Sequence, residues 1–150
     1  MLEFGRFAAQ HCAQRGLRRP KTFDFLGFTH ICGVTRTNGR FTVMRLTSSK
    51  RMRATLNAIR QTLKRRKHEP IPVIGKWLRR VIRGYFNYHA VLGNSWRSTF
   101  RKEVGRAWLH ALRRRGQHGR MSWARFMRYV ARYVPLVRVL HPCPNQRFTS

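Results

Sequence analysis

The chain has 150 residues, of which 42% are hydrophobic and 10 Phe, 4 Tyr and 4 Trp are aromatic, and this composition excludes a wholly disordered basic tail. Its length fits one domain, or one compact piece with appendages. The 33 Lys and Arg against 4 Asp and Glu give a net charge of +29, a repulsion that calls for a polyanionic partner such as a nucleic acid.

The first part of the chain predicts a short helix followed by a β-hairpin. Apolar residues within 1–15 favour the helix. Residues 22–32 and 40–46 are rich in aromatic and β-branched residues, and Asn38-Gly39 between them is a hairpin turn signal. Gly27, inside the first of these strands, predicts a bulge or a close backbone approach. Because a two-stranded ribbon is marginal alone, we expect later helices or a partner domain to cover its aromatic face.

Two helices are predicted next, each with an apolar and a cationic side. Thr47 and Ser48 are candidate caps for a helix that continues to about residue 67. The second helix, Pro72 to Asn94, has Pro at its start and Gly93 near its end. Its predicted inner face is Ile74, Trp77, Leu78, Val81, Ile82, Tyr85, Tyr88, His89 and Leu92. Its predicted outer face is Lys76, Arg80, Arg83 and Asn87, and Arg79 lies between the two faces.

Two more helices and a tail complete the prediction of a mainly α fold, in which a β-hairpin precedes a basic helical bundle. One helix starts at Asn94-Ser95, with Phe100, Val104 and Trp108 in its inner stripe. Ser122 caps another, which Pro135 stops. The tail from 136 to 150 contains two prolines and is expected to be extended and irregular.

The sequence contains few candidate catalytic residues. The four carboxylates, Glu3, Asp24, Glu69 and Glu103, form no pair at helical or turn spacing, whereas two-metal phosphoryl transfer needs several. The sequence has no P-loop, nucleophile elbow or dinucleotide fingerprint. His89 is expected to have a hydrogen-bonded packing role. We therefore expect no enzymatic activity from this chain alone.

No cofactor, metal or membrane is expected as a partner. Cys12, Cys32 and Cys143 are far apart and predict reduced thiols. No apolar run approaches the ~18 to 20 residues of a membrane span. Glu3, Gly5 and Arg6 interrupt any signal-peptide pattern. A cytoplasmic, nucleic-acid-associated protein is the expectation, and an anionic membrane surface is the alternative.

A broad basic surface is predicted across the three central helices. A solvated protein surface normally carries both positive and negative side chains. This surface is almost entirely positive, so we expect it to bind a polyanion. The excess of Arg over Lys and the many aromatic residues favour RNA over DNA. The candidate RNA-binding residues are Arg53, Arg60, Lys64, Lys76, Arg79, Arg80, Arg83, Arg97, Arg101 and Arg106.

Three segments resemble the C-terminal part of group II intron-encoded reverse transcriptase/maturases. Residues 23–30, FDFLGFTH, are similar to the last block of the reverse transcriptase palm. Residues 77–89, WLRRVIRGYFNYH, resemble the signature of the maturase-specific thumb, or X, domain. Residues 108–115 and 141–148 resemble the ending of the family. The resemblance divides the chain into a palm-end remnant (1–46), a thumb/X domain (47–121) and a C-terminal helix with its tail (122–150).

The resemblance implies a thumb that binds intron RNA and assists its folding and splicing, and that cradles the template–primer duplex. Phe25, Leu26 and Gly27 correspond to the primer-grip hairpin. The structural residues of the thumb-domain signature correspond to Trp77, Gly84, Tyr85 and Tyr88. The three aromatic residues among them are expected to act mainly as packing anchors. The fingers and most of the palm, with the catalytic Tyr-x-Asp-Asp box, are missing from this sequence. The expected function is therefore a truncated, RNA-binding maturase domain, and the alternative is a fragment that complements a separate fingers–palm piece.

Overall fold

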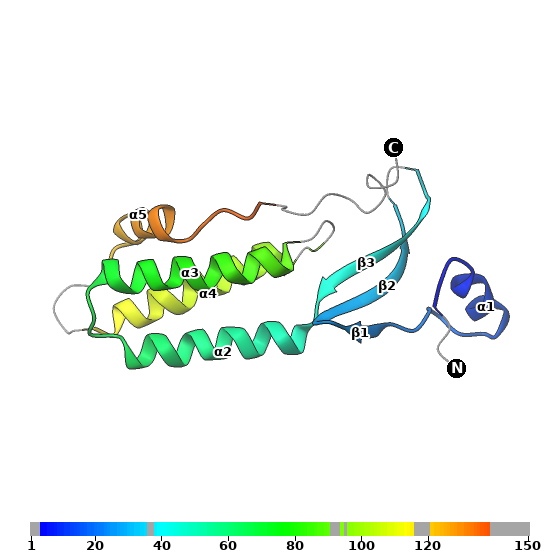
Figure 1. The fold of residues 1–150 in the computed structure, drawn as a ribbon, viewed down its shortest axis with the longest axis horizontal. Helices are drawn as coiled ribbons and strands as arrows, with labels where there is room; N and C mark the ends of the chain where they lie inside the picture. The colour runs from blue at the N-terminus through cyan, green and yellow to red at the C-terminus, as the bar shows by residue number, and fades with distance from the viewer. Residues whose placement is uncertain (1–3, 36–37, 91–93, 95, 116–120, 139–150) are drawn as a thin grey trace. The chain divides into compact units, whose positions relative to one another are not determined.

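The computed structural model describes residues 4–35, 38–90, 94, 96–115 and 121–138. It is mainly helical, with one antiparallel sheet before the main helices, as the sequence predicts (Figure 1). The chain forms two compact units, Met1–Ser49 and Lys50–Ser150. This division lies close to the predicted boundary after residue 46, and each unit is described in turn.

The first unit is a helix followed by a three-stranded meander. It contains α1 (Ala8–Gln14), β1 (Phe23–Phe25), β2 (Phe28–Val34) and β3 (Phe41–Thr47), with the strands in the order β1-β2-β3. The register pairs Phe23 with His30 and Phe25 with Phe28. Because alternate residues share a face, these four rings lie on the same side of the sheet. The rings of Phe23 and His30 stack at 4.9 Å.

The first predicted strand is in fact two strands. Of the two alternatives predicted for Gly27, the bulge is wrong, whereas another backbone segment does approach it: the Ser48 N–H donates to the Gly27 carbonyl oxygen at 3.0 Å. Leu26 and Gly27 have φ values of 49° and 79°, and they form the two-residue turn between β1 and β2. Positive φ at both central positions is the geometry that matches the twist of a tight hairpin. Gly27 is therefore needed for the turn.

The predicted hairpin between residues 22–32 and 40–46 is confirmed as the pairing of β2 with β3. At its closed end the Thr35 N–H donates to the Arg40 carbonyl oxygen at 2.8 Å, and Gly39 has a φ of 63°. Thr37, part of the predicted turn, lies outside the described residues. Asp24, the only aspartate in the chain, accepts hydrogen bonds from Thr29 and from Ser48.

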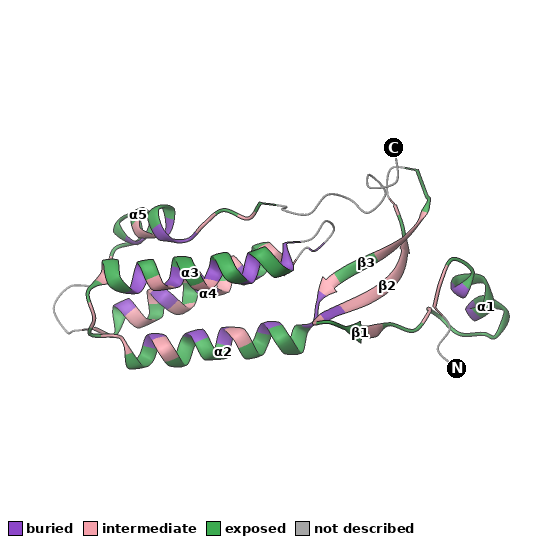
Figure 2. Ribbon diagram, viewed as in Figure 1, coloured by how far each residue is buried: buried purple, intermediate pink, exposed green. Residues whose placement is uncertain are grey.

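The second unit is a helical bundle. It contains α2 (Ser49–Arg65), α3 (Ile71–His89), α4 (Trp96–Arg113) and α5 (Trp123–Tyr133). Buried positions recur along each helix at the helical period (Figure 2). The apolar side predicted for α2 is buried, at Met52, Leu56, Ile59 and Leu63. On α4 the predicted Phe100, Val104 and Trp108 are buried, Leu112 is buried with them, and Ala111 is half-buried. The predicted Ser122 cap is also confirmed, because its Oγ accepts from the Arg125 N–H at 3.3 Å.

One assignment on α3 is wrong. Tyr88, which the sequence places on the inner face, is 52% exposed, and Phe86 is buried in its stead. The reason is the position of α4, whose Phe100 stacks on Tyr85 at 3.6 Å and meets Phe86 edge-on at 6.0 Å. The core side of α3 is thus rotated toward Phe86. The predicted helix end at Gly93 lies outside the described residues, and α3 stops at His89.

Candidate nucleic-acid interface

Four cations form an open row on the outer side of α3. Lys76, Arg79, Arg80 and Arg83 are all exposed, so Arg79, which the sequence left between two faces, belongs with the other three. Helix α3 contains no Asp or Glu. None of the four has a hydrogen bond or ion pair with any residue that the structure describes. We call these four residues the α3 quartet.

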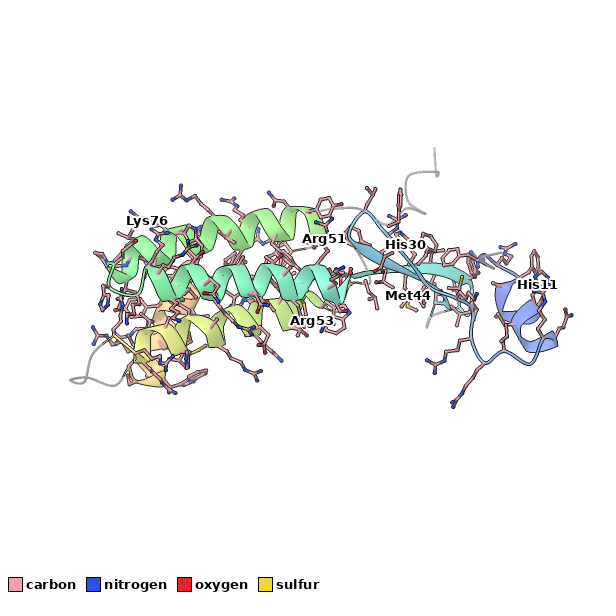
Figure 3. The ribbon with its side chains drawn as sticks, turned by 90° about the horizontal axis from the view of Figure 1, so that it is seen from below. His11, His30, Met44, Arg51, Arg53 and Lys76 are labelled. Carbon is pink, nitrogen blue, oxygen red and sulfur yellow. The ribbon has the colours of Figure 1, made fainter. Side chains whose placement is uncertain are left out.

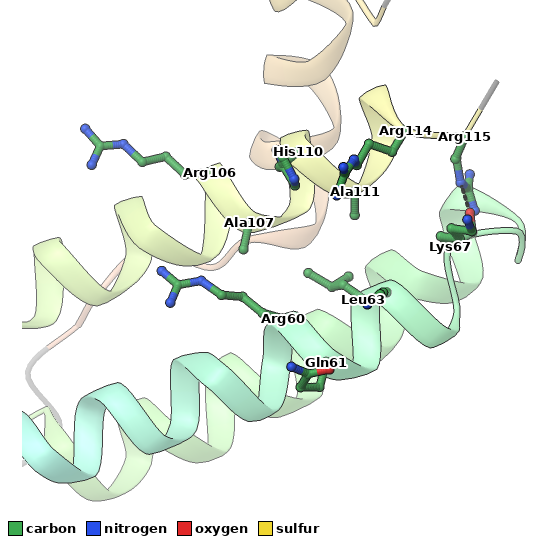
Figure 4. Close-up of a pocket in the computed structure, with 11 residues that line it drawn as sticks. Arg60, Gln61, Leu63, Lys67, Arg106, Ala107, His110, Ala111, Arg114 and Arg115 are labelled. Carbon is green, nitrogen blue, oxygen red and sulfur yellow. Dashed lines mark hydrogen bonds between the residues drawn. The ribbon is translucent and has the colours of Figure 1, made fainter. Parts of the chain in front are cut away.

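A basic groove lies between α2 and α4. Its volume is about 930 Å³, and Figure 4 shows the side chains that line it. The floor is made by Leu63, Ala107 and Ala111. The walls carry basic side chains from both helices and the residues that follow them: Arg60, Lys64, Lys67, Arg106, His110, Arg114 and Arg115. We call this feature the α2/α4 groove.

Glu103 is shared by two arginines of this groove. Arg60 Nη2 lies 3.3 Å from Glu103 Oε2, and Arg106 Nη1 lies 2.7 Å from Glu103 Oε1. Both guanidinium groups are largely exposed, so solvent screens the two ion pairs and each contributes little to stability. Lys64 and Arg114 are exposed and form no ion pair with a described residue. The groove therefore keeps a net positive charge.

Arg115 closes one end of the groove. Its Nε donates to the Lys67 carbonyl oxygen, and its Nη2 is buried with no hydrogen-bond partner among the described residues. Burial lowers the pKa of Arg115, and the nearby Glu69 opposes that shift. A guanidinium stays protonated in proteins, so this end of the groove holds an incompletely compensated charge.

Two of the predicted RNA-binding residues, Arg97 and Arg101, instead donate hydrogen bonds to backbone carbonyl oxygens of the chain. Both are half-buried. Arg97 Nε donates to the Asn94 carbonyl oxygen at 2.7 Å, and Arg101 Nε donates to the Pro135 carbonyl oxygen at 3.2 Å. Arg53 is exposed on α2 (Figure 3). The structure thus brings together the α3 quartet in one place and Arg60, Lys64 and Arg106 in another.

Sequence reasoning did not select Lys67, His110, Arg114 or Arg115 for the groove. The pattern that points to them is the basic ending of both α2 and α4. These two helices are separated by α3, which returns the chain, so α2 and α4 run in the same direction and their basic ends lie together (Figure 1).

The residues singled out by the family resemblance fall in different settings. Phe25 and Leu26 are 59% and 67% exposed at the tip of the β1–β2 hairpin, next to Gly27. Tyr85 is buried. Trp77 is half-buried beneath Arg66, whose Cζ lies 5.4 Å from the indole centroid. Gly84 is exposed, and a Cβ added there would meet nothing within 4 Å. The segment 141–148 lies outside the described residues.

His89 is buried at the end of α3, between the rings of Tyr85 at 4.4 Å and Tyr88 at 4.8 Å. Burial is the main cause that lowers its pKa, and the positive charge of Arg51 adds to the effect. The neutral imidazole is therefore the favoured form in the folded protein.

Among the residues that the structure describes, no three His, Cys, Asp or Glu gather as metal ligands. In the same residues, no helix is both long and apolar enough to cross a membrane. Cys12 and Cys32 are free thiols. Comparisons of the chain with protein-family profiles, with curated protein sequences and with solved structures gave no match.

Proposed function

We propose that this chain is an RNA-binding domain of the group II intron maturase type, which assists the folding and splicing of intron RNA. The observation that carries the RNA-binding part is the α3 quartet. Four exposed cations on one helix face, without an ion pair to a described residue, match the phosphates of a polyanion. The maturase assignment rests on the sequence resemblance in 23–30 and 77–89.

The mechanism is electrostatic clamping of folded RNA. Each Lys or Arg that neutralises a phosphate releases counterions, and the released ions favour binding at low salt. Arginine contributes bidentate contacts to phosphate oxygens and planar stacking on bases. A rigid helix that presents several such groups favours RNA conformations whose phosphates match the spacing along the helix. RNA binding in a cytoplasmic setting is part of this proposal.

Salt-dependent binding tests the proposal. The variant with Lys76, Arg79, Arg80 and Arg83 all replaced by Gln should bind structured intron RNA more weakly, and its log–log salt slope should shrink by about 3, at ~0.7 to 0.9 per lost phosphate contact. The matched control replaces Arg6, Arg18, Arg19 and Lys21 by Gln, which removes the same charges from exposed positions of the first unit.

Two outcomes would contradict the proposal. Equal loss of affinity in the quartet variant and in the control would mean that net charge alone, and not the α3 face, binds RNA. Equal affinity of the wild-type chain for intron RNA and for an unrelated structured RNA would remove the maturase part and leave general RNA binding.

A second candidate function is complementation of a separate fingers–palm piece, which would give RNA-directed DNA polymerase activity. The exposed apolar side chains of Phe25 and Leu26 favour it, because they offer a contact for a partner domain. Co-expression with a fingers–palm piece, followed by primer extension, tests it. Activity no greater than that of either piece alone would exclude complementation.

A further inference from the structure

The α3 quartet and the α2/α4 groove lie on different sides of the helical bundle, because α3 and α4 lie on opposite sides of α2. Arg51 of α2 is close enough to His89 of α3 to lower the pKa of that imidazole. Arg60 of α2 is bonded to Glu103 of α4. Nine residues separate Arg51 from Arg60, roughly two and a half helical turns, so the two side chains leave α2 on opposite sides.

The side view agrees with this arrangement. In Figure 3, Arg51 lies on the α3 side of α2, and Arg53 lies on the α4 side. Lys76 of the α3 quartet is at the edge of α3 away from α2. A strand that contacts the α3 quartet is therefore on a different side of the bundle from one that enters the groove.

Along each wall of the groove, a basic side chain recurs about once per helical turn. Arg60, Lys64 and Lys67 follow one another on the α2 side, and Arg106, His110 and Arg114 do so on the α4 side. One turn rises about 5.4 Å, so each wall presents a regular row of basic side chains. No Phe, Tyr or Trp is among the residues known to line the groove, so the large rings on which bases most often stack are missing from that lining. Its chemistry suits the sugar–phosphate backbone.

Arg115 adds an anchor at the end of this row. Its guanidinium is fixed by the bond to the Lys67 carbonyl oxygen, and its Nη2 has no partner among the described residues. A buried donor without a hydrogen-bond partner is costly, and an anion bound at that end would accept a hydrogen bond from Nη2. Arg115 therefore favours a phosphate at the groove end that is farthest from Glu103.

We propose that the α2/α4 groove is a second RNA-binding site, separate from the α3 quartet, which takes the backbone of a single RNA strand. One chain then holds two RNA segments at once and bridges them. This inference rests on the proposed function for the identity of the polyanion. It adds that the domain joins distant RNA segments, independently of their sequence at the groove.

Native mass spectrometry tests the bridge. The wild-type chain is mixed with two single-stranded RNA oligonucleotides of different mass, each too short to reach both surfaces. The expected product is a complex of one chain with one copy of each oligonucleotide. The quartet variant should hold one oligonucleotide only. The groove variant, with Lys64→Gln and Arg114→Gln at exposed positions, should also hold one.

The matched control for the groove variant is Arg18→Gln with Lys21→Gln, which removes the same two charges from the first unit and should keep both oligonucleotides. Two results would overturn the second site without contradicting RNA binding itself. One is that the wild-type chain binds only one oligonucleotide at saturation, and the other is that the groove variant still binds two. A wild-type chain that binds no oligonucleotide and no intron RNA would overturn the proposed function itself. Thermal unfolding of each variant verifies that it is folded.

Discussion

The ring of Tyr133 lies directly against the backbone of Gly75. A Cβ built on Gly75 would be 2.5 Å from Cγ of that ring and under 3.0 Å from both Cδ atoms. Gly75 and Tyr133 are both buried, and they join α3 to α5. Trp108 of α4 meets the same ring edge-on at 6.1 Å. The absence of a side chain at Gly75 therefore provides the space in which α5 packs.

Gly75→Ala should destabilise the helical unit. The added methyl group overlaps a fixed aromatic ring, and overpacking of this kind costs about 1–3 kcal/mol even though Ala favours a helix. Urea unfolding measures the change in the free energy of unfolding. Gly84→Ala on the same helix is the control, because its Cβ meets nothing within 4 Å, and it should be more stable than wild type by up to about 1 kcal/mol. Equal stability of the two variants would contradict the packing argument.

Gly84→Ala should also weaken RNA binding while it stabilises the fold. Gly84 is exposed and lies beside Arg80 and Arg83 on α3, with no internal packing that requires a glycine. In the proposed complex, a bound RNA backbone comes close to this position, and a methyl group would hold it away. The expected loss of affinity is about three- to tenfold, on the order of 1 kcal/mol.

The matched control for this effect is Gly105→Ala. Gly105 is the other helical glycine whose Cβ would meet nothing within 4 Å, and it lies on α4 outside the groove lining. It should gain stability without losing RNA affinity. A Gly84→Ala variant that binds RNA as tightly as wild type would show that RNA does not approach α3 at this turn.

Acidification should destabilise the protein through His89. Its pKa is lowered in the folded state, mainly by burial, so the unfolded chain binds a proton more readily. The stabilising effect of the neutral imidazole is complete above the unfolded pKa of about 6.5 and is lost as the pH falls through the lower folded pKa. Urea unfolding at a series of pH values below about 7 should show this decrease. His89→Gln should reduce it, and His68→Gln, at an exposed position, should not.

A second pH effect is expected at lower pH from Glu69. Arg66 Nε and Nη2 donate to its two carboxylate oxygens at 2.8 and 2.7 Å. This hydrogen bonding lowers the pKa of Glu69, while desolvation opposes the shift. The stability that the pair contributes is present above the unfolded pKa of about 4.3 and is lost as the pH falls through the folded value.

Glu69→Gln isolates this contribution. The variant should be less stable than wild type near neutral pH, and the difference between the two should diminish in acid. The measurement is the free energy of unfolding of both proteins across the acid range. A difference that is independent of pH would mean that the carboxylate charge has no part in the effect. Arg66→Lys tests the geometry, because it keeps the charge but loses the bidentate bond and the planar contact with Trp77.

Much of the fold was predictable because the helices of the bundle are amphipathic at a clear period. The inner stripes of α2 and α4 follow from spacing alone, since an apolar residue recurs every three or four positions. Ser122 was predictable as a cap, because its side chain acts on a donor within its own turn. Such features depend on residues close together in the sequence.

The misassigned residues depend on tertiary neighbours or on strand length. Phe86 and Tyr88 are both aromatic, and only the position of Phe100 decides which of them is buried. Strand β1 has three residues, too few to be separated by pattern from the strand after Gly27. The α2/α4 groove joins residues from two helices that are not consecutive, so no local pattern could define it.

The contact of Tyr133 with Gly75 also has a consequence for synthesis of the chain. The sheet of the first unit pairs consecutive strands and can form as soon as β3 has left the ribosome. Helices α2 and α3 emerge later, but the surface around Gly75 stays uncovered until α5 has been made. During that interval the part of α3 around Gly75, which Tyr133 of α5 later covers, has no cover from α5. The synthesis of the last helix therefore determines when the packing of the helical unit can be completed.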